Sequence, residues 1–255
     1  MKQSSTLLGP GALRVPEVGA YFWIIKALST AMGEATSGFL VAQFHPVLAV
    51  LLGFIGFCGG LALQLSMRRY VAWTYWFAVA MVGVFGTMAA DVMHVGFHVP
   101  YLAASFIYAL ALAAVFVVWQ RTEKTLSIHS VDTFRKELFY WAAVGATFAF
   151  GTAVGDMTAT TLHLGYLLSA VLFGAALLVP AVCFRFFRMN AILAFWAAYV
   201  LTRPLGASVA DWMAKPVSHR GLGWGDGPVT LGLVLCVAVG VAYLGVTRRD
   251  VQATG

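Results

Sequence analysis

Eight apolar stretches, each about 20 residues long, constrain this sequence more than any other feature. They occupy residues 20–41, 46–65, 73–93, 99–119, 138–160, 165–184, 191–212 and 228–246. A helix of that length crosses the ~30 Å hydrocarbon core of a bilayer, whereas barrel strands are about ten residues long and alternate in polarity. Only 10% of the residues are charged and 61% are hydrophobic, which excludes an ordinary soluble domain, where about 25% are charged. We therefore expect an all-α membrane protein with eight transmembrane helices, in a single transmembrane domain over residues 1–255.

Basic residues are distributed unevenly over the segments between these stretches. Only Lys215 and Arg220 lie in the hairpins within pairs of stretches. The terminal segments and the loops between pairs hold Lys2, Arg14, Arg68, Arg69, Arg121, Lys124, Arg135, Lys136, Arg185, Arg188, Arg248 and Arg249. Because positive charge is retained on the cytoplasmic side, we expect both termini in the cytoplasm. The net charge of +6 then reflects topology, and no nucleic-acid partner is expected. The first nineteen residues hold Pro10 and Pro16 and no continuous apolar region, so we expect no cleavable signal peptide.

An internal repeat links the odd-numbered stretches. Each ends in a motif of a small residue, Thr or Ala, two spacers, a small residue and an acid, at 29–34 (STAMGE), 86–91 (GTMAAD), 151–156 (GTAVGD) and 206–211 (GASVAD). A tryptophan precedes the acid by fifteen residues in three copies, at Trp76, Trp141 and Trp196. The pattern predicts four tandem two-helix repeats, at residues 15–72, 73–133, 134–191 and 192–250.

These motifs resemble a known family of uncharacterised bacterial membrane proteins that are built from four tandem two-helix repeats of unknown function. The similarity rests on the four acid motifs, the tryptophans and the stretches 21–26 (YFWIIK), 162–167 (LHLGYL) and 203–208 (RPLGAS). It covers roughly residues 15–247. The resemblance implies a multi-pass protein of the bacterial inner membrane, and it implies no particular activity.

The spacing between tryptophan and acid predicts the depth of the acids. Fifteen helical residues span about 22 Å, so tryptophans in the cytoplasmic aromatic belt would place the acids in the outer half of the membrane. Repeats with an even number of spans all enter the membrane in the same direction. The small residues in each motif would let the helices approach closely. We therefore expect the four acids to meet on one axis beneath the outer surface.

Ionisable residues inside the spans point to a site. The four acids of the repeats are Glu34, Asp91, Asp156 and Asp211. A carboxylate at that depth costs at least ~2.5 kcal/mol, so one in each repeat indicates a cation site or a proton relay; acids that are protonated, or that only hold helices together, are the structural alternative. Lys26 and Arg203 each lie eight residues before an acid. We expect these two bases either to pair with the acids or to gate the cytoplasmic half. The formal charge of −2 that remains suits a divalent cation or one or two protons.

Histidines follow the acids on the side of the hairpins. His94 and His98 come three and seven residues after Asp91, and His163 comes seven residues after Asp156. Carboxylates with imidazoles suit divalent Mn, Zn or Fe, while proton shuttling by histidine is the alternative. The predicted metal ligands are Glu34, Asp91, His94, His98, Asp156, His163 and Asp211, with His45 and His219 as ligands at the outer mouth.

Two classes of function fit this pattern. The first is a transporter or channel-like carrier of a divalent metal cation of unknown identity, with proton coupling left open. The second is an intramembrane metal- or haem-binding enzyme or redox protein. No hydrolase or flavin motif is present, so we expect a transport protein and not an enzyme. The expected partners are the lipid bilayer, a small inorganic cation or protons, with a second copy of the chain as an open alternative.

Overall fold

The computed structural model describes residues 13–252, and within that range the chain is all-helical. Lys2 and Pro10, which enter the sequence predictions, lie outside the described residues. The eight α-helices are α1 (Ala20–Gln43), α2 (Pro46–Ser66), α3 (Ala72–Asp91), α4 (Tyr101–Glu123), α5 (Phe134–Asp156), α6 (Gly165–Phe186), α7 (Ala191–Ala214) and α8 (Asp226–Thr247). Four single turns, η1 (Val92–Gly96), η2 (Ile128–Ser130), η3 (Met157–Thr161) and η4 (Val217–His219), join them.

Seven of these helices are long and apolar enough to cross a membrane, which fits a multi-pass membrane protein. The exception is α1, which is as long as the others but contains Lys26 and Glu34 together with several hydroxyl side chains. The prediction of an all-α fold is confirmed. Helices α2 to α8 have the length and apolar composition that spanning a membrane requires.

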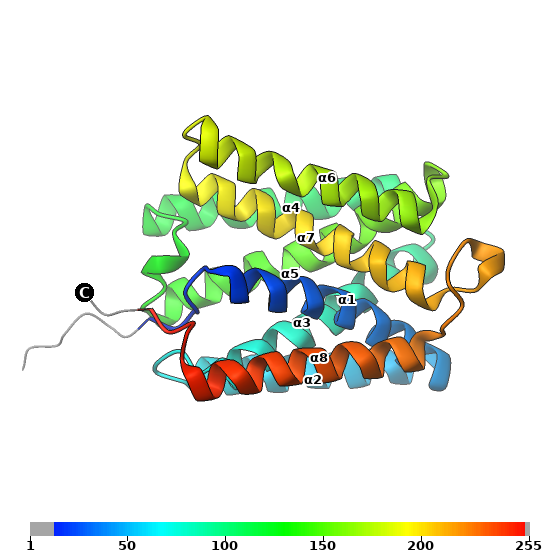
Figure 1. Cartoon of the computed structure of the whole chain (residues 1–255), viewed down its shortest axis with the longest axis horizontal. Coiled ribbons are helices and arrows are strands. Elements are labelled where there is room, and N and C mark those ends of the chain that lie inside the picture. The colour runs from blue at the N-terminus through cyan, green and yellow to red at the C-terminus, as the bar shows by residue number, and fades with distance from the viewer. Residues whose placement is uncertain (1–12, 253–255) are drawn as a thin grey trace, which may run out of the picture.

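The odd-numbered helices form an inner ring. Helix α1 packs on α3 and α7, and α5 closes the ring by packing on α3 and α7. Each even-numbered helix covers the ring from outside and packs mainly on the next odd-numbered helix, with α8 packing on α1 (Figure 1). The inner helices are accordingly more buried: 61% of the span of α3 is buried inside the protein, against 17% of that of α2.

Small residues set how closely the ring helices approach. A Cβ atom on Gly33 of α1 would lie 2.9 Å from the carbonyl carbon of Gly83 on α3. A Cβ on Gly206 of α7 would likewise lie 2.9 Å from the backbone nitrogen of Ala31. Both distances are shorter than a real side chain tolerates, so these contacts require glycine. The four acid motifs, which contain these small residues, are thereby drawn towards one axis.

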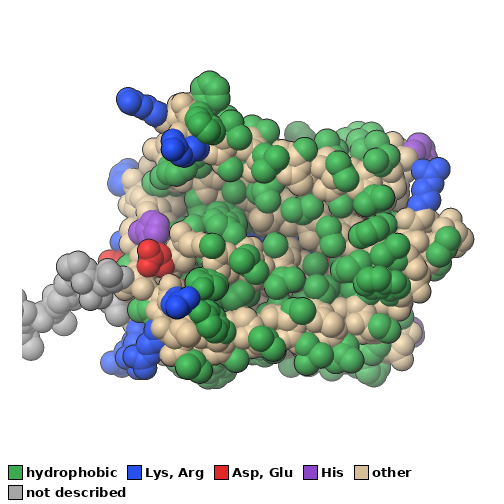
Figure 2. All heavy atoms as spheres, in the orientation of Figure 1, with side chains coloured by type: hydrophobic (Ala, Val, Ile, Leu, Met, Phe, Trp, Pro, Cys, Tyr) green, Lys and Arg blue, Asp and Glu red, His purple; other side chains and the backbone are tan. Residues whose placement is uncertain are grey.

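The two ends of the bundle differ in charge. The hairpins within helix pairs lie at one end, called here the hairpin end, and the loops between pairs lie with both terminal segments at the other, called the basic end (Figure 1). In Figure 2 the Lys and Arg side chains gather mostly at the basic end, and hydrophobic side chains dominate the surface between the two ends.

A buried polar network closes the basic end. Glu137 in the first turn of α5 is fully buried and accepts hydrogen bonds from Arg14 at 2.7 Å and from Gln64 at 2.9 Å. The N-terminal segment that carries Arg14 crosses this end, where Tyr70 donates a backbone hydrogen bond to the carbonyl of Leu13. No role for Glu137 is predicted from the sequence, because only the fold brings its hydrogen-bond partners together.

The repeated tryptophans do not form an aromatic belt, and that expectation is wrong. Trp76, Trp141 and Trp196 are only 1%, 4% and 4% exposed and pack inside the bundle. They lie with Tyr75, Tyr140 and Tyr199, all fully buried, in a layer at the half of the ring near the basic end. The residues repeat because they occupy equivalent inward positions on the ring helices, where large rings fill the axis. We call Tyr75, Trp76, Tyr140, Trp141, Trp196 and Tyr199 the aromatic layer.

Candidate functional site

The acids of the four repeats lie together in the half of the ring near the hairpin end. They are Glu34, Asp91, Asp156 and Asp211, called here the acid quartet. Each comes from a different ring helix, and Asp91 and Asp156 are the last residues of α3 and α5. Glu34 lies close enough to Asp91, Asp156 and Asp211 for its negative charge to act on each of these carboxylates. Such an arrangement attracts a cation or shares protons.

A turn of π-helix follows two of the acids. Backbone hydrogen bonds of 3.0 Å from Phe97 to Val92 and of 2.9 Å from Leu162 to Met157 close these turns, η1 and η3. Such turns insert one extra residue into a helix and are frequent at functional sites. The two repeats therefore share a local distortion immediately after the acid.

Arg203 connects all four ring helices directly beneath the quartet. Its side chain is fully buried, and its Nη2 atom donates to Glu34 of α1 at 2.7 Å. The same atom donates to Thr87 of α3 at 2.5 Å and to Thr152 of α5 at 2.7 Å. Both threonines lie four residues before an acid, as does Thr30, whose carbonyl faces Nη1 at 3.5 Å. The guanidinium thus holds the ring together on its axis and neutralises one acid of the quartet.

Lys26 lies deeper, on the side of Arg203 away from the quartet. Its Nζ atom is 4.3 Å from the ring centroid of Phe148 and 4.2 Å from that of Tyr199. The side chain is fully buried and has no hydrogen-bond partner within the described residues. Cation–π contacts stabilise this ammonium in place of a carboxylate. The expected pairing of a base with an acid is therefore found for Arg203, across repeats, while Lys26 faces aromatic rings.

Lys215 neutralises a second acid of the quartet. Its Nζ atom is 3.5 Å from Asp211 and 3.6 Å from Asp226, the first residue of α8. Burial alone would lower the pKa of Lys215, but the carboxylates of Asp211 and Asp226 raise it above its ordinary value, so the side chain stays charged. From the sequence, Lys215 is predicted only as a charged residue in a hairpin loop. The spacing of four residues from Asp211 is a signal that could have found the pair.

Two acids of the quartet remain without a partner. Within residues 13–252, the carboxylates of Asp91 and Asp156 take part in no ion pair and accept no hydrogen bond. Both residues are only partly buried, so their side chains are reachable. Arg203 and Lys215 balance Glu34 and Asp211. The quartet therefore keeps a formal charge of −2 on Asp91 and Asp156.

The five histidines predicted as ligands lie around the hairpin end and not among the acids. His94 stacks on Tyr101 at 3.6 Å between ring centroids, and its Nδ1 atom lies 2.9 Å from the carbonyl of Val99. His98 and His163 are exposed, and both have a φ of 57°, a left-handed conformation in which histidine is enriched. His98 and His163 occupy equivalent positions in the repeat because each lies two residues after the last residue of its π-helical turn, η1 or η3. His45 and His219 are also exposed, at the start of α2 and in η4.

No preformed metal centre is present in the described part of the chain, where no three His, Cys, Asp or Glu side chains gather closely enough to hold an ion. The contacts above give the physical reason. Glu34 and Asp211 are engaged by cations, and the loop conformations leave His98 and His163 exposed at the hairpin end.

Comparison with known proteins finds a family model described as a repeat of unknown function (DUF347). It matches residues 74–125, 139–190 and 194–250. These ranges correspond to the second, third and fourth predicted repeats, and the first, residues 15–72, lies outside them. No curated protein matches the chain, and no solved structure matches it.

Proposed function

We propose that this chain, which belongs to the DUF347 repeat family, is a membrane carrier of a small divalent cation that binds between Asp91 and Asp156. The membership confirms the resemblance to uncharacterised repeat proteins seen in the sequence. The family carries no assigned activity, so the proposal rests on the chemistry of the acid quartet.

The membrane arrangement is part of this proposal. All eight α-helices would cross the bilayer, with α1 shielded from lipid along the ring by α8 and its ring neighbours. The basic end would face the cytoplasm, because positively charged segments are retained there. The resemblance to uncharacterised bacterial membrane proteins supports a location in the bacterial inner membrane. The acid quartet would then open towards the outside.

The two unpaired carboxylates are the observation that carries the proposal. Ionisable groups inside a membrane are costly and generally mark ion or proton pathways. A purely structural quartet would be expected to pair all its charges, as Glu34 does with Arg203 at 2.7 Å. A charge of −2 on Asp91 and Asp156 is balanced by one divalent cation or by two protons. The carrier could therefore release the cation, bind two protons and return to its starting conformation without a net charge on these two residues.

The ligand set favours a hard cation. Two carboxylates with water suit Mg²⁺ or Mn²⁺, whereas Zn²⁺ prefers imidazole or thiolate. Because no histidine joins the quartet in this conformation, a hydrated Mn²⁺-like ion fits better than Zn²⁺. His98 and His163 at the hairpin end would be positioned to meet the ion before it enters.

Arg203 and Lys26 account for closure towards the basic end. Both bases lie between the quartet and the aromatic layer, and both contact Phe148, with Arg203 Cζ 5.3 Å and Lys26 Nζ 4.3 Å from its ring centroid. Their charge repels a cation that moves inward. Passage of the ion therefore requires Arg203 to break its hydrogen bonds to at least one ring helix. This step would switch access to the acid quartet from one side of the membrane to the other.

Uptake of ⁵⁴Mn²⁺ into proteoliposomes tests this function. The double variant Asp91→Asn, Asp156→Asn should lose uptake, while Asp132→Asn, which removes an acid paired with Lys136 at the basic end, should transport normally. Uptake that is unchanged in the double variant would refute the proposal. An absorption spectrum of the same purified protein checks the alternative enzyme function, which predicts a Soret band from bound haem.

A further inference from the structure

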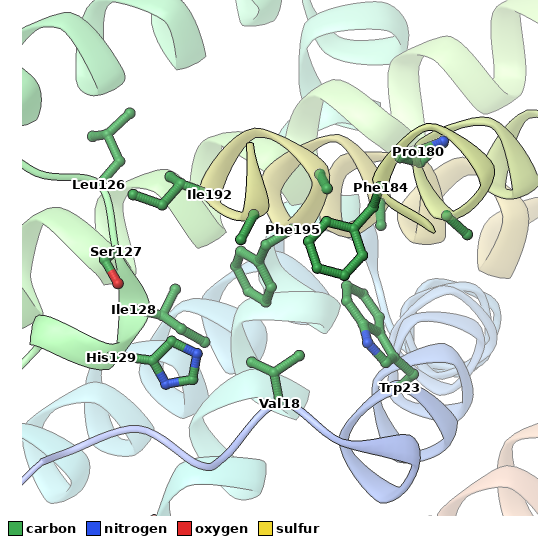
Figure 3. A pocket seen from close by; sticks show the side chains of 14 residues that line it. Val18, Trp23, Leu126, Ser127, Ile128, His129, Pro180, Phe184, Ile192 and Phe195 are labelled. Carbon is green, nitrogen blue, oxygen red and sulfur yellow. The ribbon is translucent and has the colours of Figure 1, made fainter. Parts of the chain in front are cut away.

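A groove of about 480 Å³ opens on the side of the bundle near the basic end. It lies where the start of α1, the end of α6 and the start of α7 meet the loop that contains Leu126 and His129 (Figure 3). Its walls are mostly apolar, with Trp23, Phe184 and Phe195 as the largest side chains and Ser127 and His129 as the polar ones. This groove is separate from the acid quartet, which lies towards the other end of the ring.

The groove exists because small side chains face one another. Ala181 of α6 and Ala191, Ala194 and Ala198 of α7 line it, and Pro180 interrupts the backbone hydrogen bonding of α6 beside them. The apolar surface next to it is exposed, as the 52% exposure of Phe184 shows. An apolar slot within such a surface, in a protein that spans a membrane, is in contact with lipid chains.

Basic residues next to the groove-lining segments in the sequence indicate which lipid would occupy it. Arg185 directly follows Phe184, and Arg188 comes three residues before Ala191. Arg185 and Arg188 lie at the end of α6 and in the turn to α7, the two helices that form the upper wall in Figure 3. Both side chains are exposed, and neither has a carboxylate partner within residues 13–252. The nearest acid in sequence to the opposite wall is Glu17, which precedes Val18. A phosphate would therefore be attracted to the α6–α7 side, because exposed basic residues near a membrane surface attract anionic lipid headgroups.

We infer that this groove holds one acyl chain of an anionic phospholipid, with its phosphate on Arg185 and Arg188. The inference does not depend on the proposed transport activity. A single bound lipid would account for the apolar walls, the small lining residues and the two arginines beside the α6–α7 side.

Quenching of Trp23 fluorescence by brominated lipids tests the inference. The protein is reconstituted in phosphatidylcholine with increasing fractions of brominated phosphatidylglycerol or, separately, brominated phosphatidylcholine. The contribution of Trp23 is the difference between the natural chain and the Trp23→Phe variant, which removes signals from the other tryptophans. We expect brominated phosphatidylglycerol to quench Trp23 half-maximally at a mole fraction at least threefold lower than brominated phosphatidylcholine.

Matched variants separate a site from general lipid contact. Ala181→Phe should fill the groove and abolish the preference, while Ala103→Phe on the exposed face of α4 should leave it unchanged. The double variant Arg185→Gln, Arg188→Gln should reduce the preference at least threefold but still allow quenching by both lipids. Equal quenching by the two lipids in the natural chain, or a preference that survives Ala181→Phe, would overturn the inference.

Discussion

Both halves of the ring contain an arginine–glutamate pair at 2.7 Å, yet the surroundings of the two pairs differ. Near the basic end, Glu137 is fully buried, and its oxygens accept from Arg14, Gln64 and, at 3.5 Å, the indole of Trp141. Near the hairpin end, the pair of Arg203 and Glu34 lies beside two carboxylates that have no partner.

The difference separates a structural site from a functional one. The charge of Glu137 is compensated by Arg14, and both Glu137 oxygens accept hydrogen bonds, which is typical of a network that holds a fold together. The acid quartet has uncompensated charge and partly exposed side chains, which no gain in stability explains. One set of four helices thus carries a closed, structural half and an open, reactive half.

The largest effect of a single substitution on ion binding is expected for Asp156→Asn. Removing one of two binding carboxylates should weaken Mn²⁺ binding at least about tenfold, which corresponds to about 1.4 kcal/mol. Stability should be unchanged or higher, because an unpaired buried charge is lost. Isothermal titration with Mn²⁺ and thermal unfolding in detergent measure the two effects. Unfolding of the variant with no loss of affinity in the folded fraction would show that the quartet is structural.

Glu137→Gln and Glu34→Gln test the two pairs against each other. Glu34→Gln leaves the fully buried Arg203, and Glu137→Gln the partly buried Arg14, without its carboxylate. Each loss costs about 3 kcal/mol of folding free energy. Only Glu34→Gln should also change Mn²⁺ affinity, since Glu137 lies at the opposite end of the ring. The free energy of unfolding in detergent and the ion titration check this. Loss of ion binding in folded Glu137→Gln would break the distinction between the halves.

The variant Lys26→Met tests whether Lys26 closes the ion path towards the basic end. The ammonium has no carboxylate partner, and replacing buried ionic groups by apolar residues of similar size is often stabilising by about 1 kcal/mol or more. We expect a higher melting temperature together with faster leak of Mn²⁺ from loaded proteoliposomes. Lys136→Met, which removes a partly exposed base at the basic end, serves as the control for charge. A destabilised Lys26→Met variant would mean that the cation–π contacts hold the ring.

The smallest effect is expected for Lys215→Gln. The side chain is 32% exposed, so its ion pairs with Asp211 and Asp226 should stabilise the fold by less than about 1 kcal/mol. Because the pKa of Lys215 is raised in the folded chain, the contribution is complete below its ordinary pKa and is lost only in strongly alkaline solution. The stability difference should therefore still be present at about pH 9. A difference that has vanished at that pH, measured by thermal unfolding, would contradict the pairing.

Much of the fold could be predicted from apolar runs and repeated motifs. The predicted stretch 46–65 appears as α2 (Pro46–Ser66), and 191–212 appears as α7 (Ala191–Ala214). The motif spacing also anticipated that the acids share one register. The burial of Trp141 could not be predicted in the same way, because a tryptophan near a helix end fits an aromatic belt equally well.

The sequence by itself determined the helices, their pairing into repeats and the position of one acid in each repeat. These features depend on local hydrogen bonding and on apolar length, since a chain in lipid must satisfy its backbone within each helix. Only the tertiary structure decided which charges meet: Arg203 pairs with Glu34 because α7 and α1 are neighbours in the closed ring. Likewise, Asp91 and Asp156 are left unpaired because the available cations are held by other helices. An ion pair forms only when the two charged groups are a few ångströms apart. Residues more than 150 positions apart come that close only when the ring closes.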